Sequence, residues 1–207
     1  ESMKIAVIGA SGKTGRAFVD EAVQRGHEVR AGVFHTNSFT RSDYIDVIRC
    51  DALQLDDVIN LTRGCDAVVS LIGHVKDSPE FLQTRATANI LSAMGKHHIH
   101  RLVSVTGTGV RRPGDTPSLA DLILNTGLRI ADPARLRDGR AHADVLIDSD
   151  VDWTILRVLK LTNYGKGRYR LTDHGPARTF VSRATIASAI LDILIDDSHI
   201  RQMPVVS

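Results

Sequence analysis

A glycine-rich segment placed between a strand-like and a helix-like stretch constrains the fold of this chain most strongly. Residues 3–8 (MKIAVI) form a short apolar run typical of a buried parallel strand, and the segment GASGKTG at 9–15 follows it directly. Residues 16–25 then place apolar side chains at helical spacing. A strand, a glycine-rich turn and a helix in this order predict a site where the helix N-terminus faces a pyrophosphate.

Each glycine has a steric role in such a turn. Gly9 permits a tight exit from the strand, Gly12 lets a pyrophosphate approach without a Cβ in the way, and Gly15 allows the helix to pack closely. Ser11, Lys13 and Thr14 complete the predicted cofactor-binding segment. The alternative is a turn that uses glycines without binding a nucleotide. NTP hydrolysis is disfavoured, because the NTPase phosphate loop needs a glycine where this chain has Val7.

The rest of the chain alternates between strand-like and helix-like segments. The pattern predicts strands at 28–34, 47–49, 67–72, 101–106 and 153–158, and helices at 55–63, 81–96 and 133–148. Asp51 is the predicted N-cap of the helix at 55–63. This alternation predicts an α/β fold, a doubly wound, mostly parallel sheet with helices on both faces. Residues 107–132 have weak periodicity and are predicted to be a mobile segment over the site.

The length of 207 residues predicts a single domain over 1–207. Within it, 1–158 is the expected dinucleotide-binding core and 159–207 a small C-terminal annex on the substrate side. In the annex we expect a loop with a short strand at 164–174, strands at 179–181 and near 203–206, and a helix at 183–195.

Composition excludes several classes of function. The net charge of +2 and the scattered five Phe, three Tyr and one Trp give no footprint for nucleic acid. No apolar window is long enough to span a membrane, and we expect no secretory leader. Cys50 and Cys65 are not in CxxC spacing, so we expect neither metal nor disulfide, and a cytoplasmic location.

The end of the second strand bears on the choice of cofactor. NAD-preferring folds place a carboxylate there, whereas this chain reads Phe34-His35-Thr36-Asn37. A 2′-phosphate would not be repelled, and Lys13, His35 and Arg41 are candidates to contact it. The sequence therefore favours NADP(H) over NAD(H).

Together these motifs resemble the atypical short-chain dehydrogenases with an NAD(P)H-binding Rossmann fold. The chain is most similar to the biliverdin IXβ reductase and flavin reductase proteins and their NmrA-like relatives, and the resemblance covers nearly the whole chain. It rests on GASGKTG at 9–15, GHEV at 26–29, CD at 50–51, CDAVV at 65–69, LIG at 71–73, ANI at 88–90, AM at 93–94, SDVDWT at 149–154 and GPAR at 175–178.

The resemblance implies positions for the cofactor. Gly9 to Gly15 would hold the pyrophosphate, and Phe34, His35 and Thr36 would lie by the adenosine ribose. By the same resemblance, the adenine would contact Asp51 and Ala52, and the nicotinamide-side phosphate and ribose would contact Ile72, Gly73 and His74. Thr106 would border the nicotinamide, with Val158, Leu159 and Lys160 on its far side.

The sequence departs from the group at three positions: Phe34 replaces an arginine, Gly107 a serine, and Val158 a proline. The Tyr-x-x-x-Lys pair of typical short-chain dehydrogenases is absent, because Ile48, Arg168 and Asp173 lie four residues after the three tyrosines. Thr106 and Lys160 are therefore the catalytic candidates, and His142 lacks a visible partner. We expect solvent to supply the proton, with Lys160 as the first choice if a side chain does.

Two functions follow as expectations. The first is an NADPH-dependent reductase that transfers a hydride to a flavin-, quinone- or tetrapyrrole-like small molecule, which needs mainly orientation from the protein. The alternative is a non-catalytic, NmrA-like redox sensor that binds the cofactor and changes its affinity for a partner. A monomer or a homodimer fits either function.

Overall fold

The main sheet organises the molecule. The computed structural model describes residues 2–35, 39–40, 42–75 and 77–207. Strands of the main sheet are β1 Lys4–Ile8, β2 Glu28–Val33, β3 Ile45–Arg49, β4 Ala67–Ser70, β5 Arg101–Gly107, β6 Asp152–Val158, β8 Leu171–Thr172 and β10 Val205–Val206. Their order is β3-β2-β1-β4-β5-β6-β10-β8, and all neighbours pair in parallel except β10 and β8.

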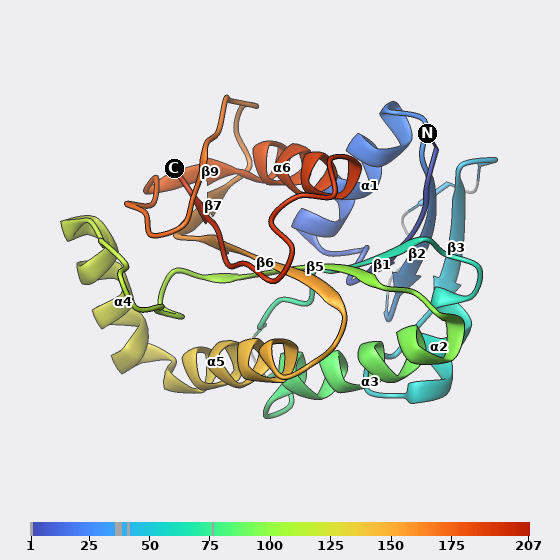
Figure 1. Cartoon of the computed structure of the whole chain (residues 1–207), viewed down its shortest axis with the longest axis horizontal. Helices are drawn as coiled ribbons and strands as arrows, with labels where there is room; N and C mark the ends of the chain where they lie inside the picture. Colours follow the sequence, from blue (N-terminus) through green and yellow to red (C-terminus); the bar gives the residue numbers. More distant parts are fainter. Residues whose placement is uncertain (1, 36–38, 41, 76) are drawn as a thin grey trace.

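Helices cover both faces of this sheet (Figure 1). The helices α1 (Lys13–Gln24) and α6 (Arg183–Ile195) lie on one face, and α2 (Leu55–Thr62), α3 (Leu82–His97) and α5 (Pro133–Ile147) lie on the other. Alternate residues of β1 supply the two cores: Ile5 and Val7 join the α1 and α6 side, whereas Ala6 and Ile8 join the other side. The predicted doubly wound α/β fold is confirmed.

The strand order fixes where a ligand can bind. From β1 the chain crosses to β2 on one side, and β4 lies on the other side of β1. In sheets of this kind ligands bind outside the carboxyl ends of the strands, at the point where the strand order reverses. The segments that leave β1 and β4, at 9–12 and 71–81, lie at this point.

The second half of residues 107–132, where the weak periodicity predicted no helix, forms helix α4 (Leu119–Ala131). Ser118 caps it by accepting a hydrogen bond from the backbone N–H of Asp121, a capping signal that the sequence contained. The apolar residues of α4 point outward, Leu119 being 74% and Ile130 80% exposed. In Figure 1, α4 lies at the end of the molecule opposite β3. Among the described residues, no helix combines the length and apolarity needed to cross a membrane.

The prediction that Asp51 caps α2 was also wrong. Gln54 holds the N-cap position and makes no side-chain hydrogen bond there. The carboxylate of Asp51 instead accepts the backbone N–H of Leu53 at 2.9 Å, closing a local turn before the helix begins.

The C-terminal segment, which was predicted to be a small annex, contributes two strands to the main sheet. The expected strands near 164–174 and 203–206 are β8 and β10, which extend the main sheet beyond β6. Strand β7 (Lys160–Thr162), which was not predicted, pairs in parallel with β9 (Phe180–Ser182) in a separate two-stranded sheet.

Candidate functional site

The glycine-rich turn has the geometry that its sequence predicts. Gly9 has a φ of +77°, and a Cβ there would lie 2.7 Å from the carbonyl oxygen of Leu71. A Cβ on Gly15 would lie 2.1 Å from the carbonyl oxygen of Gly9, so only glycine permits this approach of α1 to the turn. A Cβ on Gly12 would meet nothing closer than 3.4 Å. The fold therefore requires glycine at 9 and 15 but not at 12.

The N-terminus of α1 is free to bind an anion. Gly12 is its N-cap, no side chain caps it, and no acidic residue lies in its first turn. Lys13 is exposed, and Ser11 and Thr14 are half-buried beside it. Exposed N–H groups and the positive end of the helix dipole, with no carboxylate in the first turn, fit a pyrophosphate.

Beside the glycine-rich turn lies a cation that the sequence reasoning missed. Arg16 donates from Nε to the carbonyl oxygen of Ser11 at 3.0 Å, and its guanidinium lies 6.0 Å from the ring centre of Phe39. A basic residue directly after Gly15 was the available signal. Phe34 is 47% exposed and its ring lies 3.9 Å from that of His35. The predicted contacts at Thr36 and Arg41, with Asn37, lie outside the described residues.

The remaining predicted adenine and ribose contacts lie at the exits of β3 and β4. Asp51 and Ala52 follow β3, and the carbonyl oxygen of Ala52 accepts from Asn89 at 2.9 Å. Ile72 and Gly73 follow β4, and a Cβ on Gly73 would meet nothing within 4 Å. This backbone is open to a ligand beside the glycine-rich turn.

The next residue, His74, belongs to a pair that sequence reasoning did not find. Its Nε2 lies 2.7 Å from Oδ2 of Asp138, which comes from α5. The two residues are 64 positions apart, and no local spacing signals such a contact.

The two predicted catalytic residues are placed differently from one another. Thr106, on β5, is buried against α5, where a Cβ on Gly139 would lie 3.0 Å from the Thr106 hydroxyl oxygen. Val158 accepts the backbone N–H of Thr108 at 3.0 Å, and Leu159 is half-buried. Lys160 is exposed, with its ammonium 5.7 Å from the ring centre of Phe180. The structure thus brings Thr106 toward α5 and directs Lys160 toward β9.

His142 has a partner after all. Its Nε2 lies 2.8 Å from the hydroxyl of Ser104 on β5, and both residues are buried. Burial lowers the pKa of His142 to about 4, so its imidazole is neutral at neutral pH. Burial likewise raises the pKa of the Cys50 and Cys65 thiols to about 12, which makes neither a nucleophile.

A sequence comparison places this site in a known family. Residues 9–197 match the family described as NAD(P)H-binding. The chain belongs to the NAD(P)H-binding family. The matched range begins at Gly9 and therefore includes the whole glycine-rich turn. The chain is also similar to the uncharacterized protein YwnB of Bacillus subtilis (strain 168), with 27% identity over 95% of this chain and 94% of YwnB.

Solved structures share the fold of this NAD(P)H-binding protein. A short-chain dehydrogenase/reductase from Veillonella parvula DSM 2008, solved in complex with NADP, matches with a TM-score of 0.82 at 20% identity over 100% of this chain and 95% of that one. SP1627 from Streptococcus pneumoniae TIGR4, a candidate NADH-flavin reductase, matches with a TM-score of 0.77 at 23% identity over 99% of each chain. The expected membership of an NAD(P)H-binding family is confirmed, and these structures confirm the fold.

The open space beside Gly12 allows a direct test of where the pyrophosphate binds. We expect Gly12→Val to weaken NADPH binding at least tenfold, about 1.4 kcal/mol, because the new side chain occupies the place of the pyrophosphate while the fold tolerates it. Gly127→Val on the exposed helix α4 is the matched control, since a Cβ at Gly127 would meet no atom within 4 Å. Calorimetric titration measures both variants, and equal affinity in Gly12→Val and the wild type would refute the assignment.

Proposed function

We propose that this protein is an NADPH-dependent reductase. The observation that carries the proposal is the uncapped N-terminus of α1 behind a glycine turn at the reversal point of the sheet. Gly9, Gly12 and Gly15 would hold the pyrophosphate, and the backbone of Ile72 and Gly73 would run beside the nicotinamide-side phosphate. A bound dinucleotide supplies two electrons and one hydrogen as hydride.

The charge at the adenosine end favours NADPH over NADH. The described residues after β2, Phe34 and His35, carry no carboxylate. Lys13 and Arg16 at the start of α1 add two cations near this end. A 2′-phosphate would therefore meet positive charge, which supports NADP(H) as the cofactor.

A flat conjugated molecule is the acceptor that this site suits best. Flavin-, quinone- and tetrapyrrole-like acceptors take a hydride without the Tyr-x-x-x-Lys pair, which this sequence lacks. The candidate NADH-flavin reductase among the fold neighbours supports the flavin class. In this proposal the whole chain acts as one unit, and residues 159–207 lie on the acceptor side of it.

Steady-state oxidation of NADPH with FMN, FAD and quinones tests the proposal. Turnover that requires both protein and acceptor supports it. Tight NADPH binding without turnover for any acceptor would favour the redox-sensor alternative. That alternative is favoured by one observation, because the predicted catalytic Lys160 is directed at Phe180.

Phe34 offers a test of the cofactor preference. We expect the wild type to bind NADPH more tightly than NADH, and Phe34→Arg to increase that preference by about tenfold through a charge-assisted contact. Phe34→Asp should weaken NADPH selectively. Titration of each variant with both dinucleotides measures this. A wild type that prefers NADH, or a Phe34→Asp variant with unchanged NADPH affinity, would refute the adenosine-end assignment.

A further inference from the structure

We propose that His74, held by Asp138, donates the proton that completes reduction of the acceptor, an inference that rests on the proposed reductase function. His74 would be the catalytic residue and Asp138 a positioning residue. This assigns to the pair the role that sequence reasoning gave to solvent or to Lys160.

The surroundings of Asp138 keep its side chain ionised as a carboxylate. It is 0% exposed, and Oδ1 accepts the backbone N–H and the hydroxyl of Thr84 at 2.9 and 2.6 Å. Oδ2 accepts the backbone N–H of Gln83 at 2.9 Å as well as His74. Burial alone would raise the pKa of Asp138, but these hydrogen bonds outweigh it and lower the pKa below its usual value.

The ionised carboxylate decides which nitrogen of His74 carries a proton. A carboxylate can only accept, so Nε2 must be the N–H that faces Oδ2. Nδ1 has no hydrogen-bond partner among the described residues, and it is the nitrogen left for a ligand. In the doubly protonated ring both nitrogens carry a proton, and this is the form that can give one up from Nδ1.

Hydrogen bonds connect the pair to the end of β5. Gln83, which donates its backbone N–H to Asp138, donates its side-chain amide to the carbonyl oxygen of Val105 at 3.0 Å. Gly139, the residue after Asp138, lies against the hydroxyl of Thr106. The pair therefore lies at the carboxyl edge where the resemblance places the nicotinamide.

His74 is also accessible. It lines a cleft of about 270 Å³ whose walls come from the segment after β4 and the start of α5. Val75, Phe81 and Ala134 give the cleft apolar surface. The charged residues that line the cleft with His74 are Asp77 and Glu80 from the segment, and Asp132 and Arg137 from the N-cap and first turns of α5.

Once the acceptor has taken the hydride, it carries one additional negative charge on a ring nitrogen or oxygen. The N–H bond at Nδ1 of His74 breaks, and a new N–H or O–H bond forms on the acceptor. His74 becomes neutral and keeps its Nε2–H on Asp138. Water in the cleft returns a proton to Nδ1.

The activity test compares variants of His74 and Asp138 with a matched histidine. With saturating NADPH and with FMN, we expect His74→Ala to lower kcat at least a hundredfold, a loss that exceeds any change in NADPH affinity. Added imidazole should restore part of the turnover. Asp138→Asn should also lower kcat, because the ring loses the carboxylate that holds its Nε2–H. His100→Gln, an exposed histidine before β5 at the opposite edge of the sheet, should leave kcat unchanged.

A second readout needs no turnover. Heteronuclear NMR of the imidazole nitrogens in the unliganded protein should show His74 as the Nε2–H form when neutral, and Asp138→Asn should abolish this preference. An Nδ1–H form in the wild type would overturn the proposal. Turnover of His74→Ala within tenfold of the wild type would overturn it and leave the reductase function standing. A wild type that oxidises no NADPH would refute the function, and the role of His74 with it.

Discussion

Replacing Arg157 by methionine is expected to lower the free energy of unfolding by about 3–5 kcal/mol, the largest effect among the variants considered. Arg157 is 1% exposed, and its guanidinium binds both carboxylate oxygens of Asp115 at 2.6 and 3.0 Å. It also donates to the backbone carbonyl oxygens of Met203, Val110 and Asp173. The variant would leave the buried carboxylate of Asp115 without its guanidinium partner. It would also leave the three carbonyl oxygens without the hydrogen bonds from Arg157.

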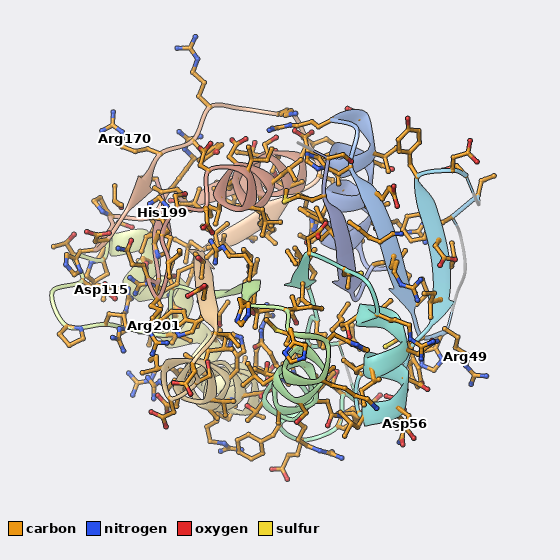
Figure 2. The ribbon with its side chains drawn as sticks, turned by 45° about the vertical axis from the view of Figure 1, so that its right-hand side comes forward. Arg49, Asp56, Asp115, Arg170, His199 and Arg201 are labelled. Carbon is orange, nitrogen blue, oxygen red and sulfur yellow. The ribbon has the colours of Figure 1, made fainter. Side chains whose placement is uncertain are left out.

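The pair connects segments that are far apart in the sequence. Asp115 precedes α4, and Arg157 lies on β6 next to β10. Figure 2 shows Asp115 on the side of the molecule away from Arg49 and Asp56. Burial tends to raise the pKa of Asp115, but hydrogen bonds from Arg157 outweigh it and lower the pKa, so the carboxylate stays charged.

Urea unfolding of three variants measures this effect. Arg170→Met, at an exposed arginine labelled in Figure 2, should change stability by less than about 0.5 kcal/mol. The double variant Arg157→Met with Asp115→Asn should be more stable than Arg157→Met alone, because the unpaired charge is gone. A double variant less stable than the single one would contradict the account.

The pH dependence of stability should be dominated near neutrality by His142. Its pKa is lowered from 6.5 to about 4 by burial, so the unfolded chain takes up a proton as the pH falls through 6.5 and the folded protein does not. The contribution of His142 to the free energy of unfolding is complete above about pH 6.5. It is lost progressively as the pH falls to about 4. Between about pH 7 and pH 5 the loss amounts to about 2 kcal/mol.

A glutamine at this position isolates the effect. His142→Gln can keep a hydrogen bond to Ser104 but cannot take up a proton. Unfolding free energies at about pH 7 and pH 5 should differ by about 2 kcal/mol less in His142→Gln than in the wild type. The pKa of His27 is also lowered by burial, but His27 is present in both proteins and cancels in the comparison. Equal differences in the two proteins would contradict a neutral buried His142.

Local sequence patterns predicted the parts of the fold that depend on local physics. The glycine turn and the strand that precedes it follow from steric rules within about a dozen residues. Helix α4 was missed because Asn125, Thr126 and Gly127 interrupt its apolar pattern, although Ser118 and Asp121 signalled its start. Asp51 was misassigned because the same side chain can cap a helix or close a turn.

The side-chain pairs could not be predicted in this way, because they join residues from distant elements. His74 meets Asp138 only when the segment after β4 packs on α5, and Arg157 meets Asp115 only across β6 and the segment before α4. Burial also changes what such residues do: it keeps His142 neutral, and with Thr84 and Gln83 it builds the site that holds Asp138 charged.

The central claim is that this chain reduces an acceptor with NADPH bound at its glycine turn. The most direct measurement is the rate of NADPH oxidation with FMN by the wild type and by Gly12→Val, at an NADPH concentration well below the Kd of both proteins. The account predicts oxidation that depends on acceptor and protein in the wild type, and a rate at least tenfold lower in Gly12→Val. Equal rates in the two proteins, or no oxidation by the wild type, would contradict it.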